Sequence, residues 1–163
     1  MPPPLASRVV RMLAILLIGL VSGALIEEYF FLDVILRGFP AEQWLLAHSR
    51  FAMLHPYSLI PAAVLGLLLI FLTFAVDRDV RSPRAIATWG AAAAGVVIGG
   101  ITALIMMPMN NEIAGWVTTG PPPNLTEVQE EWIRLQAVRA VLSTTGFLLL
   151  ILSTQLRGKD GRL

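Results

Sequence analysis

The chain has 163 residues, of which 56% are hydrophobic and only 14% are charged, and its mean hydropathy is +0.72. Soluble domains carry about 25% charged residues, so this composition indicates an integral membrane protein, with residues 1–163 forming one transmembrane domain. The net charge of +1 gives no basis for nucleic-acid binding, and the lack of cysteine excludes disulfides, iron–sulfur clusters, thiolate metal sites and cysteine nucleophiles.

Four apolar segments are each long enough to cross about 30 Å of hydrocarbon, which takes about 20 residues of helix. In chain order they cover residues 9–32, 57–76, 85–107 and 135–156. No strand-like alternation of apolar and polar residues competes with them. The sequence therefore predicts an all-α, integral membrane four-helix bundle, with connections 33–56 and 108–134 on one side of the membrane.

The first segment has an alternative interpretation as a cleaved signal peptide. Arg8 and Arg11 would form its basic region, and VSGA offers a weak cleavage site. Apolar residues continue beyond Glu28 in YFFLDVIL, which favours a helix that stays in the membrane. In that helix we expect the long side chain of Arg11 to reach the membrane surface.

The distribution of Lys and Arg predicts the orientation, because cytoplasmic connections carry an excess of both. Four of them lie in or beside the connections 33–56 and 108–134 (Arg37, Arg50, Arg134 and Arg139), and eight lie on the other side (Arg8, Arg11, Arg78, Arg81, Arg84, Arg157, Lys159 and Arg162). Both termini are therefore predicted to be cytoplasmic. We expect the protein in the plasma (inner) membrane of a bacterium, with its chemistry in the outer half, where both histidines lie.

The fourth segment begins with a polar stripe. Trp132, Gln136, Arg139 and Ser143 follow one another at offsets of four, three and four, which places them on one helix face. Arg139 lies 18 residues before Arg157, about 27 Å along a helix, and so near the outer edge of the hydrocarbon. The stripe indicates either anchoring at the membrane interface or one wall of a site.

An arginine at that depth needs a partner, and two carboxylates lie at matching depth. Glu27 and Glu28 end the first apolar run, and since adjacent helix residues diverge by about 100°, we expect only one of them to face inward. The alternative is that both are solvated just beyond the lipid.

The two histidines, His48 and His55, are seven residues apart, which is about 10 Å along one helix face. One small metal ion cannot bind both, and the spacings of zinc proteases and di-iron bundles are absent. We therefore predict no metal and no cofactor, although one histidine combined with Glu27, Glu28 or Glu112 stays open as an alternative.

The third segment ends in MMPMNNE. Pro108 is expected to stop the helix and to turn the chain across the outer mouth of the bundle, where Asn110 or Asn111 would cap the helix end or bond to Gln136 and Arg139. Earlier in the same segment, small residues recur every four positions at Ala91, Gly95 and Gly99. We interpret them as a surface for close helix packing.

Two stretches, MPMNNEIAGW and WIRLQAVR, resemble the anthrone oxygenase-like family of four-helix membrane proteins, much of it catalogued as a domain of unknown function. The family pattern reads approximately Pro-x-Asn-x-x-Leu-Ala, followed by Trp-x-x-Trp-Asn-x-x-Arg at the start of the last helix. Pro108, Asn110, Trp132 and Arg139 match this pattern, and Gln136 stands where the family has asparagine. The histidine that often follows is Ala137 here. The resemblance implies a four-helix membrane fold and addition of oxygen to polycyclic anthrones. The replacement of the family's asparagine by Gln136 and of its histidine by Ala137 counts against that chemistry in this chain.

Two hypotheses of function remain open. The first is a cofactor-independent oxygenase with an outer-facing pocket for an apolar, polyketide- or quinone-like substrate. Its catalytic residues would be Arg139 and Asn110 as donors to an oxyanion, with His48, His55, Glu27 or Glu28 as the base. Its substrate-binding residues would be Trp132, Gln136, Pro108, Asn111 and Ser143.

The second hypothesis is a non-catalytic accessory subunit or a lipid- or quinone-binding scaffold, in which the same polar residues would hold helix ends together. Four helices without an internal repeat argue against a transporter. The expected partners are membrane lipid and an apolar small molecule, and the sequence is compatible with a homo-oligomer or a larger membrane complex.

Overall fold

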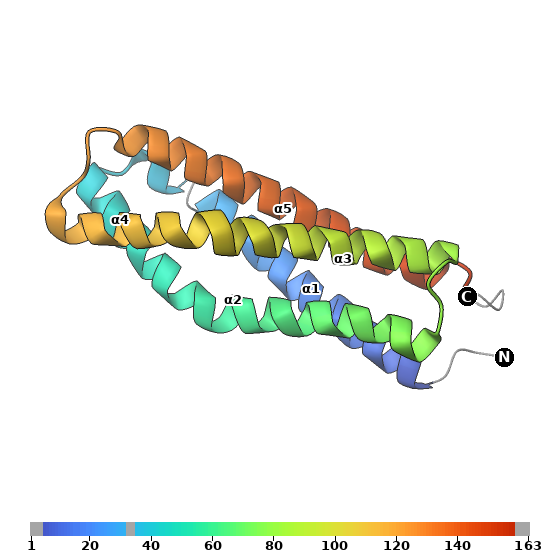
Figure 1. Ribbon diagram of the computed structural model, residues 1–163. Coiled ribbons are helices and arrows are strands. Elements are labelled where there is room, and N and C mark those ends of the chain that lie inside the picture. Colours follow the sequence, from blue (N-terminus) through green and yellow to red (C-terminus); the bar gives the residue numbers. More distant parts are fainter. Residues whose placement is uncertain (1–4, 32–34, 159–163) are drawn as a thin grey trace.

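The structure, a computed structural model, describes residues 5–31 and 35–158, without the side chains of residues 53–56. All regular structure in these ranges is helical, so the predicted all-α class is confirmed. The elements are α1 (Leu5–Phe30), the short η2 (Leu36–Gly38), α2 (Ala41–Asp77), α3 (Pro83–Ile101), η3 (Thr102–Met106), α4 (Met107–Thr119) and α5 (Leu125–Gln155). Figure 1 shows α3, η3 and α4 running on as one long rod beside α5.

Four helical stretches are long and apolar enough to cross a membrane, judged by length and composition. They are Leu5–Phe30, Tyr57–Asp77, Pro83–Thr119 and Leu125–Gln155. Their number and order confirm the four predicted spans, and they indicate an integral membrane protein. The bounds differ by several residues, and residue 32, the predicted end of the first span, lies outside the described ranges.

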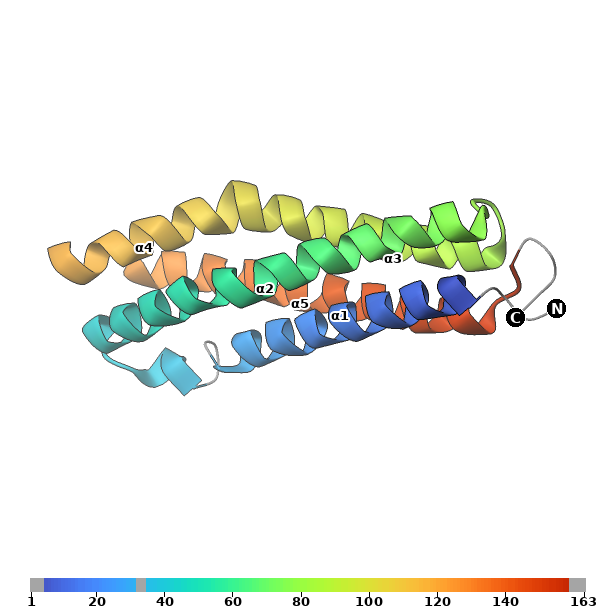
Figure 2. The ribbon, with the colours of Figure 1, turned by 90° about the horizontal axis from the view of Figure 1, so that it is seen from below.

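The bundle has two ends, which we name after the connections that they hold. At the α2–α3 end, α1 begins and α5 finishes (Figure 1). At the α4–α5 end lie η2, the start of α2 and the start of α5, as Figure 2 shows from below. The assignment of the α2–α3 end to the cytoplasm stays a prediction.

The two predicted outer connections are largely helical. Within 33–56, α2 begins at Ala41 directly after Pro40, and within 108–134, α4 continues to Thr119 before α5 begins at Leu125. Apolar runs mark where lipid surrounds a helix, whereas a helix ends only where its backbone hydrogen bonds are interrupted. Gly120, with φ of 90°, provides that interruption after α4.

Pro108 does not stop the third helix, so that expectation was wrong. The helix widens into a π turn over Thr102–Met106, in which the Met107 N–H donates to the Thr102 carbonyl, five residues back. Proline lacks an N–H and its ring clashes with the carbonyl of the preceding α-helical turn. The wider turn just before the proline accommodates the ring, and the helix continues.

The core consists of two clusters of buried apolar side chains. One lies towards the α2–α3 end and contains Ala14, Ile70, Ala91, Ala92 and Leu150. The other lies at the α4–α5 end and contains Leu36, Trp44, Leu45, Met106, Ile113, Leu125 and Trp132. The space between these two clusters holds the cavity described below.

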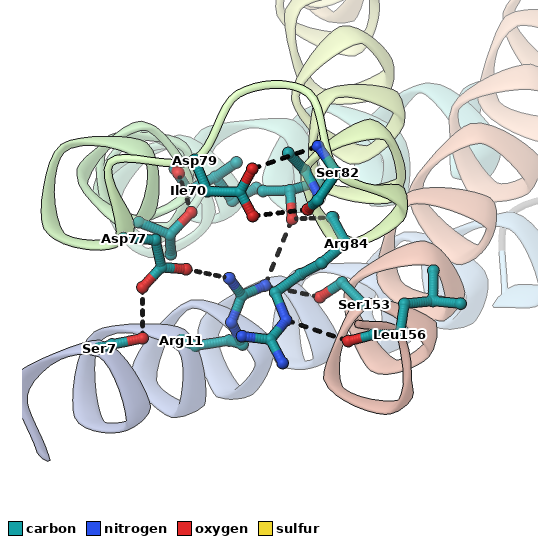
Figure 3. Close-up of polar contacts among 12 residues, drawn as sticks. Ser7, Arg11, Ile70, Asp77, Asp79, Ser82, Arg84, Ser153 and Leu156 are labelled. Carbon is teal, nitrogen blue, oxygen red and sulfur yellow. Dashed lines mark hydrogen bonds and ion pairs between the residues drawn. The ribbon is translucent and has the colours of Figure 1, made fainter. Parts of the chain in front are cut away.

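A buried arginine ties the four helices together at the α2–α3 end (Figure 3). Arg11 is 8% exposed and pairs with Asp77, with 2.6 Å between Nη2 and Oδ2. Its Nη1 donates to Ser153 Oγ at 2.7 Å and to Thr88 Oγ1 at 3.3 Å, and Ser7 also donates to Asp77. Arg11 therefore bonds α1 to α2, α3 and α5. Its side chain is turned into the bundle, where polar groups of three helices meet it, and the expectation that it reaches the membrane surface stays a prediction.

We expect Arg11→Ala to lower the free energy of unfolding by about 3–5 kcal/mol, the usual cost of leaving one member of a buried ion pair alone. Thermal unfolding in detergent measures the change. Arg8→Ala is the matched control, because Arg8 is exposed one helical turn away on α1. Equal losses for the two variants would show that the Arg11 network does not stabilise the bundle.

Candidate functional site

A cavity of about 340 Å³ lies among α1, α2, α3, η3, the start of α4 and α5. Pockets that bind small molecules usually measure about 300–1,000 Å³ and combine apolar walls with a few polar groups. Most of this wall is apolar. Its polar side chains are Glu28, Thr102, Asn110, Arg139 and Ser143.

One group of polar residues connects α1 to α5 through Gln136. This side chain is fully buried, and its Nε2 donates to Glu28 Oε2 and to the Leu25 carbonyl, both at 3.0 Å. Its Oε1 accepts a hydrogen bond from Arg139 Nη1 at 2.8 Å. Because arginine can only donate, the contact fixes which way the Gln136 amide faces. The Gln136 amide therefore places Glu28 and Arg139 at the same end of the cavity.

Arg139 is buried with an acidic partner, as its predicted depth required. It is 8% exposed, and Glu28 attracts it electrostatically. Glu27 is exposed and does not line the cavity, so only one of the two carboxylates faces inward, as expected. Glu28 and Arg139 therefore lie at the same level of the bundle, and their depth in the membrane stays a prediction.

Arg139 has a donor that no group among the described residues accepts. Its Nη1 donates to Gln136 and also approaches Met106 Sδ at 2.9 Å, whereas its Nε is buried without a hydrogen-bond partner among the described residues. An unsatisfied buried N–H costs about 1–3 kcal/mol. Because Arg139 lines the cavity, a ligand with an acceptor oxygen would remove that cost.

Asn110 presents a defined half of its amide to the cavity. Its Oδ1 accepts hydrogen bonds from Trp132 Nε1 at 2.8 Å and from His48 Nε2 at 3.3 Å. The indole N–H can only donate, so the atom that it contacts must be the oxygen of Asn110. The NH₂ group of Asn110 is thus the part of the amide that remains to donate to a ligand.

His48 and Trp132 hold Asn110 from behind and do not line the cavity. His48 is fully buried, stacked on Trp44 with 4.6 Å between ring centroids and in edge contact with Trp132 at 4.9 Å. Its Nδ1 has no hydrogen-bond partner within the described part of the chain. Trp132 is 1% exposed and is not a wall residue of the cavity, so it lies in the core behind the site and not at the substrate-binding position that the sequence suggested.

The remaining predicted site residues divide into three groups. Ser143 lines the cavity, 4% exposed, and donates to the Ala140 carbonyl at 3.0 Å. Pro108 and Asn111 are exposed and are not among the described residues that line the cavity. The side chain of His55 lies outside the described residues.

The small residues of α3 pack closely in part, as predicted, because Gly146 of α5 approaches the Ala91 backbone, but they also have a second place. Ala91, Gly95 and Gly99 all line the cavity, and Gly146 of α5 lines it too. Gly146 does approach α3 closely, with 3.4 Å from an ideal Cβ to the Ala94 Cβ. Sequence reasoning found the pattern but not this role, because small residues permit either a close contact or an empty space.

Within the described residues, no three His, Asp or Glu side chains come together to hold a metal ion. The polar end of the cavity therefore offers hydrogen-bond donors and one carboxylate. Such a set can bind an oxygen acceptor, stabilise negative charge on it, and accept a proton close by.

These features define a class: a four-helix integral membrane protein with an apolar internal cavity and buried donors at one end. The sequence model described as anthrone oxygenase matches residues 51–149, which are 99 of the 163 residues. The chain belongs to the anthrone oxygenase family. No curated protein and no solved structure matches it in the same kind of comparison. The matched segment contains Asn110, Gln136 and Arg139, whereas Glu28 precedes it.

We expect Arg139→Ala to lower the free energy of unfolding by about 3–5 kcal/mol, because it leaves Glu28 buried without its counter-charge. Arg134→Ala is the control: Arg134 is 71% exposed and pairs with Glu131 on the surface, where such pairs contribute at most about 1 kcal/mol. Thermal unfolding in detergent compares the two variants. Equal and small effects would mean that Arg139 contributes no buried pair.

A second prediction concerns the loss of folding stability at acid pH. Burial lowers the pKa of His48 from 6.5 to about 4, and its bond to Asn110 opposes this only in part. Between these pH values the unfolded chain binds a proton that folded His48 does not, so stability is lost as pH falls from about 6.5 to about 4, by up to about 1.4 kcal/mol per pH unit. In His48→Gln this dependence should be shallower. Parallel denaturation midpoints of the two proteins between pH 7 and 4.5 would refute it.

Proposed function

We propose that the protein binds an apolar, polycyclic aromatic substrate of the anthrone type in its cavity and oxygenates it with dioxygen, without a cofactor. The observation that carries the proposal is a largely apolar cavity wall that contains the Glu28 carboxylate and Arg139, whose buried Nε has no hydrogen-bond partner among the described residues. We place the protein in the plasma (inner) membrane of a bacterium, surrounded by lipid.

Binding would begin at the carbonyl oxygen of the substrate. The Nε–H of Arg139 and the NH₂ group of Asn110 would donate to this oxygen, and the apolar wall would hold the fused rings. The donors are held in place before the substrate arrives, Arg139 by Gln136 and Asn110 by Trp132. Preorganised donors of this kind stabilise negative charge strongly where water is excluded.

The proton would leave from the ring carbon opposite the carbonyl. Glu28 is the one carboxylate among the described residues that line the cavity, and we assign it the role of the base that accepts this proton. The electron pair left behind spreads through the rings to the carbonyl oxygen, where Arg139 and Asn110 bind it. Arg139 thereby stabilises the charge that Glu28 creates.

The resulting carbanion would react directly with dioxygen. A carbon–oxygen bond forms, the hydroperoxide takes up a proton, and loss of water leaves a second carbonyl. In total, one CH₂ group and one O₂ molecule give one C=O group and one H₂O molecule. The substrate is oxidised by four electrons and dioxygen is reduced by four, so no other oxidant is needed.

The experiment follows the dioxygen-dependent conversion of anthrone to anthraquinone by purified protein in lipid nanodiscs, corrected for spontaneous oxidation. We expect Glu28→Gln to slow turnover at least about 100-fold, which is typical for loss of a general base. Asn110→Ala and Arg139→Lys should cost a similar factor, because each removes a placed donor and lysine cannot reproduce the guanidinium fork.

The chain offers adjacent residues as controls. Glu27→Gln and Asn111→Ala change the same residue types at exposed positions and should leave turnover unaltered. Full turnover in a folded Glu28→Gln variant would exclude Glu28 as the base. Binding of the ligand without turnover by the unaltered protein would favour the non-catalytic, quinone-binding alternative.

A further inference from the structure

We propose that the ligand enters the cavity sideways from the bilayer, between α2 and the α3–η3 rod, and that Gly99 sets the thickness of the ligand that the cavity admits. We call this opening the portal and define it by Ile60 and Val64 of α2 and by Gly99 and Ala103 of α3 and η3. The inference rests on the proposed function only in requiring that an apolar ligand binds the cavity.

The cavity is closed along the axis of the bundle. Beyond its polar end lies the apolar cluster of the α4–α5 end, in which Trp44, Ile113 and Trp132 are each at most 1% exposed. Beyond its other end lie the second cluster and the Arg11 network. Neither end of the bundle therefore offers a ligand a path from water.

The side of the bundle, unlike its two ends, is open, because residues there line the cavity and also reach the outer surface. Val64 is 52% exposed and Ile60 is 36% exposed, and both belong to the cavity wall. Gly99 and Ala103 are exposed wall residues on the facing rod. All four lie in helices that are apolar enough to cross a membrane, so the medium outside the opening is hydrocarbon. An apolar ligand is concentrated in that medium.

Gly99 leaves space that close helix packing does not explain. An ideal Cβ built on Gly99 meets no atom within 4 Å, whereas one built on Gly95 lies 3.2 Å from Leu67. A side chain at 99 would therefore extend into the opening and narrow it. Arg139 lines the same cavity, and its buried Nε has no hydrogen-bond partner among the described residues, which is the independent sign that a polar-ended ligand occupies this space.

Gly99→Leu and Gly100→Leu test the width. Gly100 also meets no atom within 4 Å but is not among the described wall residues, so both changes add the same side chain to the same rod. The probe is anthraquinone, which has three rings and needs no turnover, and its Kd is measured in nanodiscs. We expect Gly99→Leu to raise Kd about 10-fold or more, as overpacking does, and Gly100→Leu to leave it within about twofold. Gly99→Ala, one carbon larger, should lie between them.

Val64→Trp and Leu65→Trp test the route. The two residues are adjacent on α2 and almost equally exposed, at 52% and 50%, but only Val64 lines the cavity. A bulky ring at the portal should slow association and dissociation of anthraquinone alike by about tenfold, since it obstructs the path and not the bound state. Leu65→Trp should leave both rates unaltered.

Each of these experiments has an outcome that would overturn one part of the proposal. Normal affinity in Gly99→Leu would overturn its role in ligand width, and unaltered rates in Val64→Trp would overturn the lateral route. If the unaltered protein does not bind anthraquinone, both this inference and the binding step of the proposed function fail. If it binds anthraquinone but does not oxidise anthrone, only the catalytic proposal fails.

Discussion

The lack of water in hydrocarbon determines how this bundle is held together. A charged side chain inside the membrane must find its partners within the protein. Arg11 obtains them from α2, α3 and α5, and Arg139 obtains them from η3, from Gln136 and, electrostatically, from Glu28 of α1. Arg11 therefore connects α1 to α2, α3 and α5 near one end of the bundle, whereas Arg139 connects α5 to η3 and α1 nearer the other end and keeps an Nε without a hydrogen-bond partner among the described residues.

Between these two polar ties the helices meet mostly through apolar and small side chains, apart from hydrogen bonds that Ser22 of α1 makes with Ser143 and Thr144 of α5. Transmembrane helices gain little from the hydrophobic effect in this region, because lipid tails are as apolar as the side chains themselves. A cavity can therefore persist between α2 and α3 while the ties fix the positions of the helices. The polar end of the cavity belongs to the contacts of Arg139, and other protein side chains hold both Asn110 and Arg139 in place.

The sequence could predict whatever follows from depth and helical phase. The number of spans, the buried face of Trp132, Gln136, Arg139 and Ser143, and the pairing with Glu28 all follow from 1.5 Å and 100° per residue. It could not predict the π turn before Pro108, because a proline permits both a stop and a widened turn. Nor could it show that Gly99 faces empty space, since that depends on how far away α2 lies.

The length of the helices has a thermodynamic consequence. With 37 residues, α2 extends about 55 Å, well beyond about 30 Å of hydrocarbon, so part of the Trp44–Ile113–Trp132 core lies outside the lipid tails. That end buries apolar area that unfolding would return to water, which raises the heat capacity, whereas the lipid-embedded half only exchanges protein contacts for lipid contacts. Temperature therefore changes the stability of the core behind Asn110 as it does in a soluble protein. Membrane thickness and lipid packing determine the stability of the lipid-embedded half.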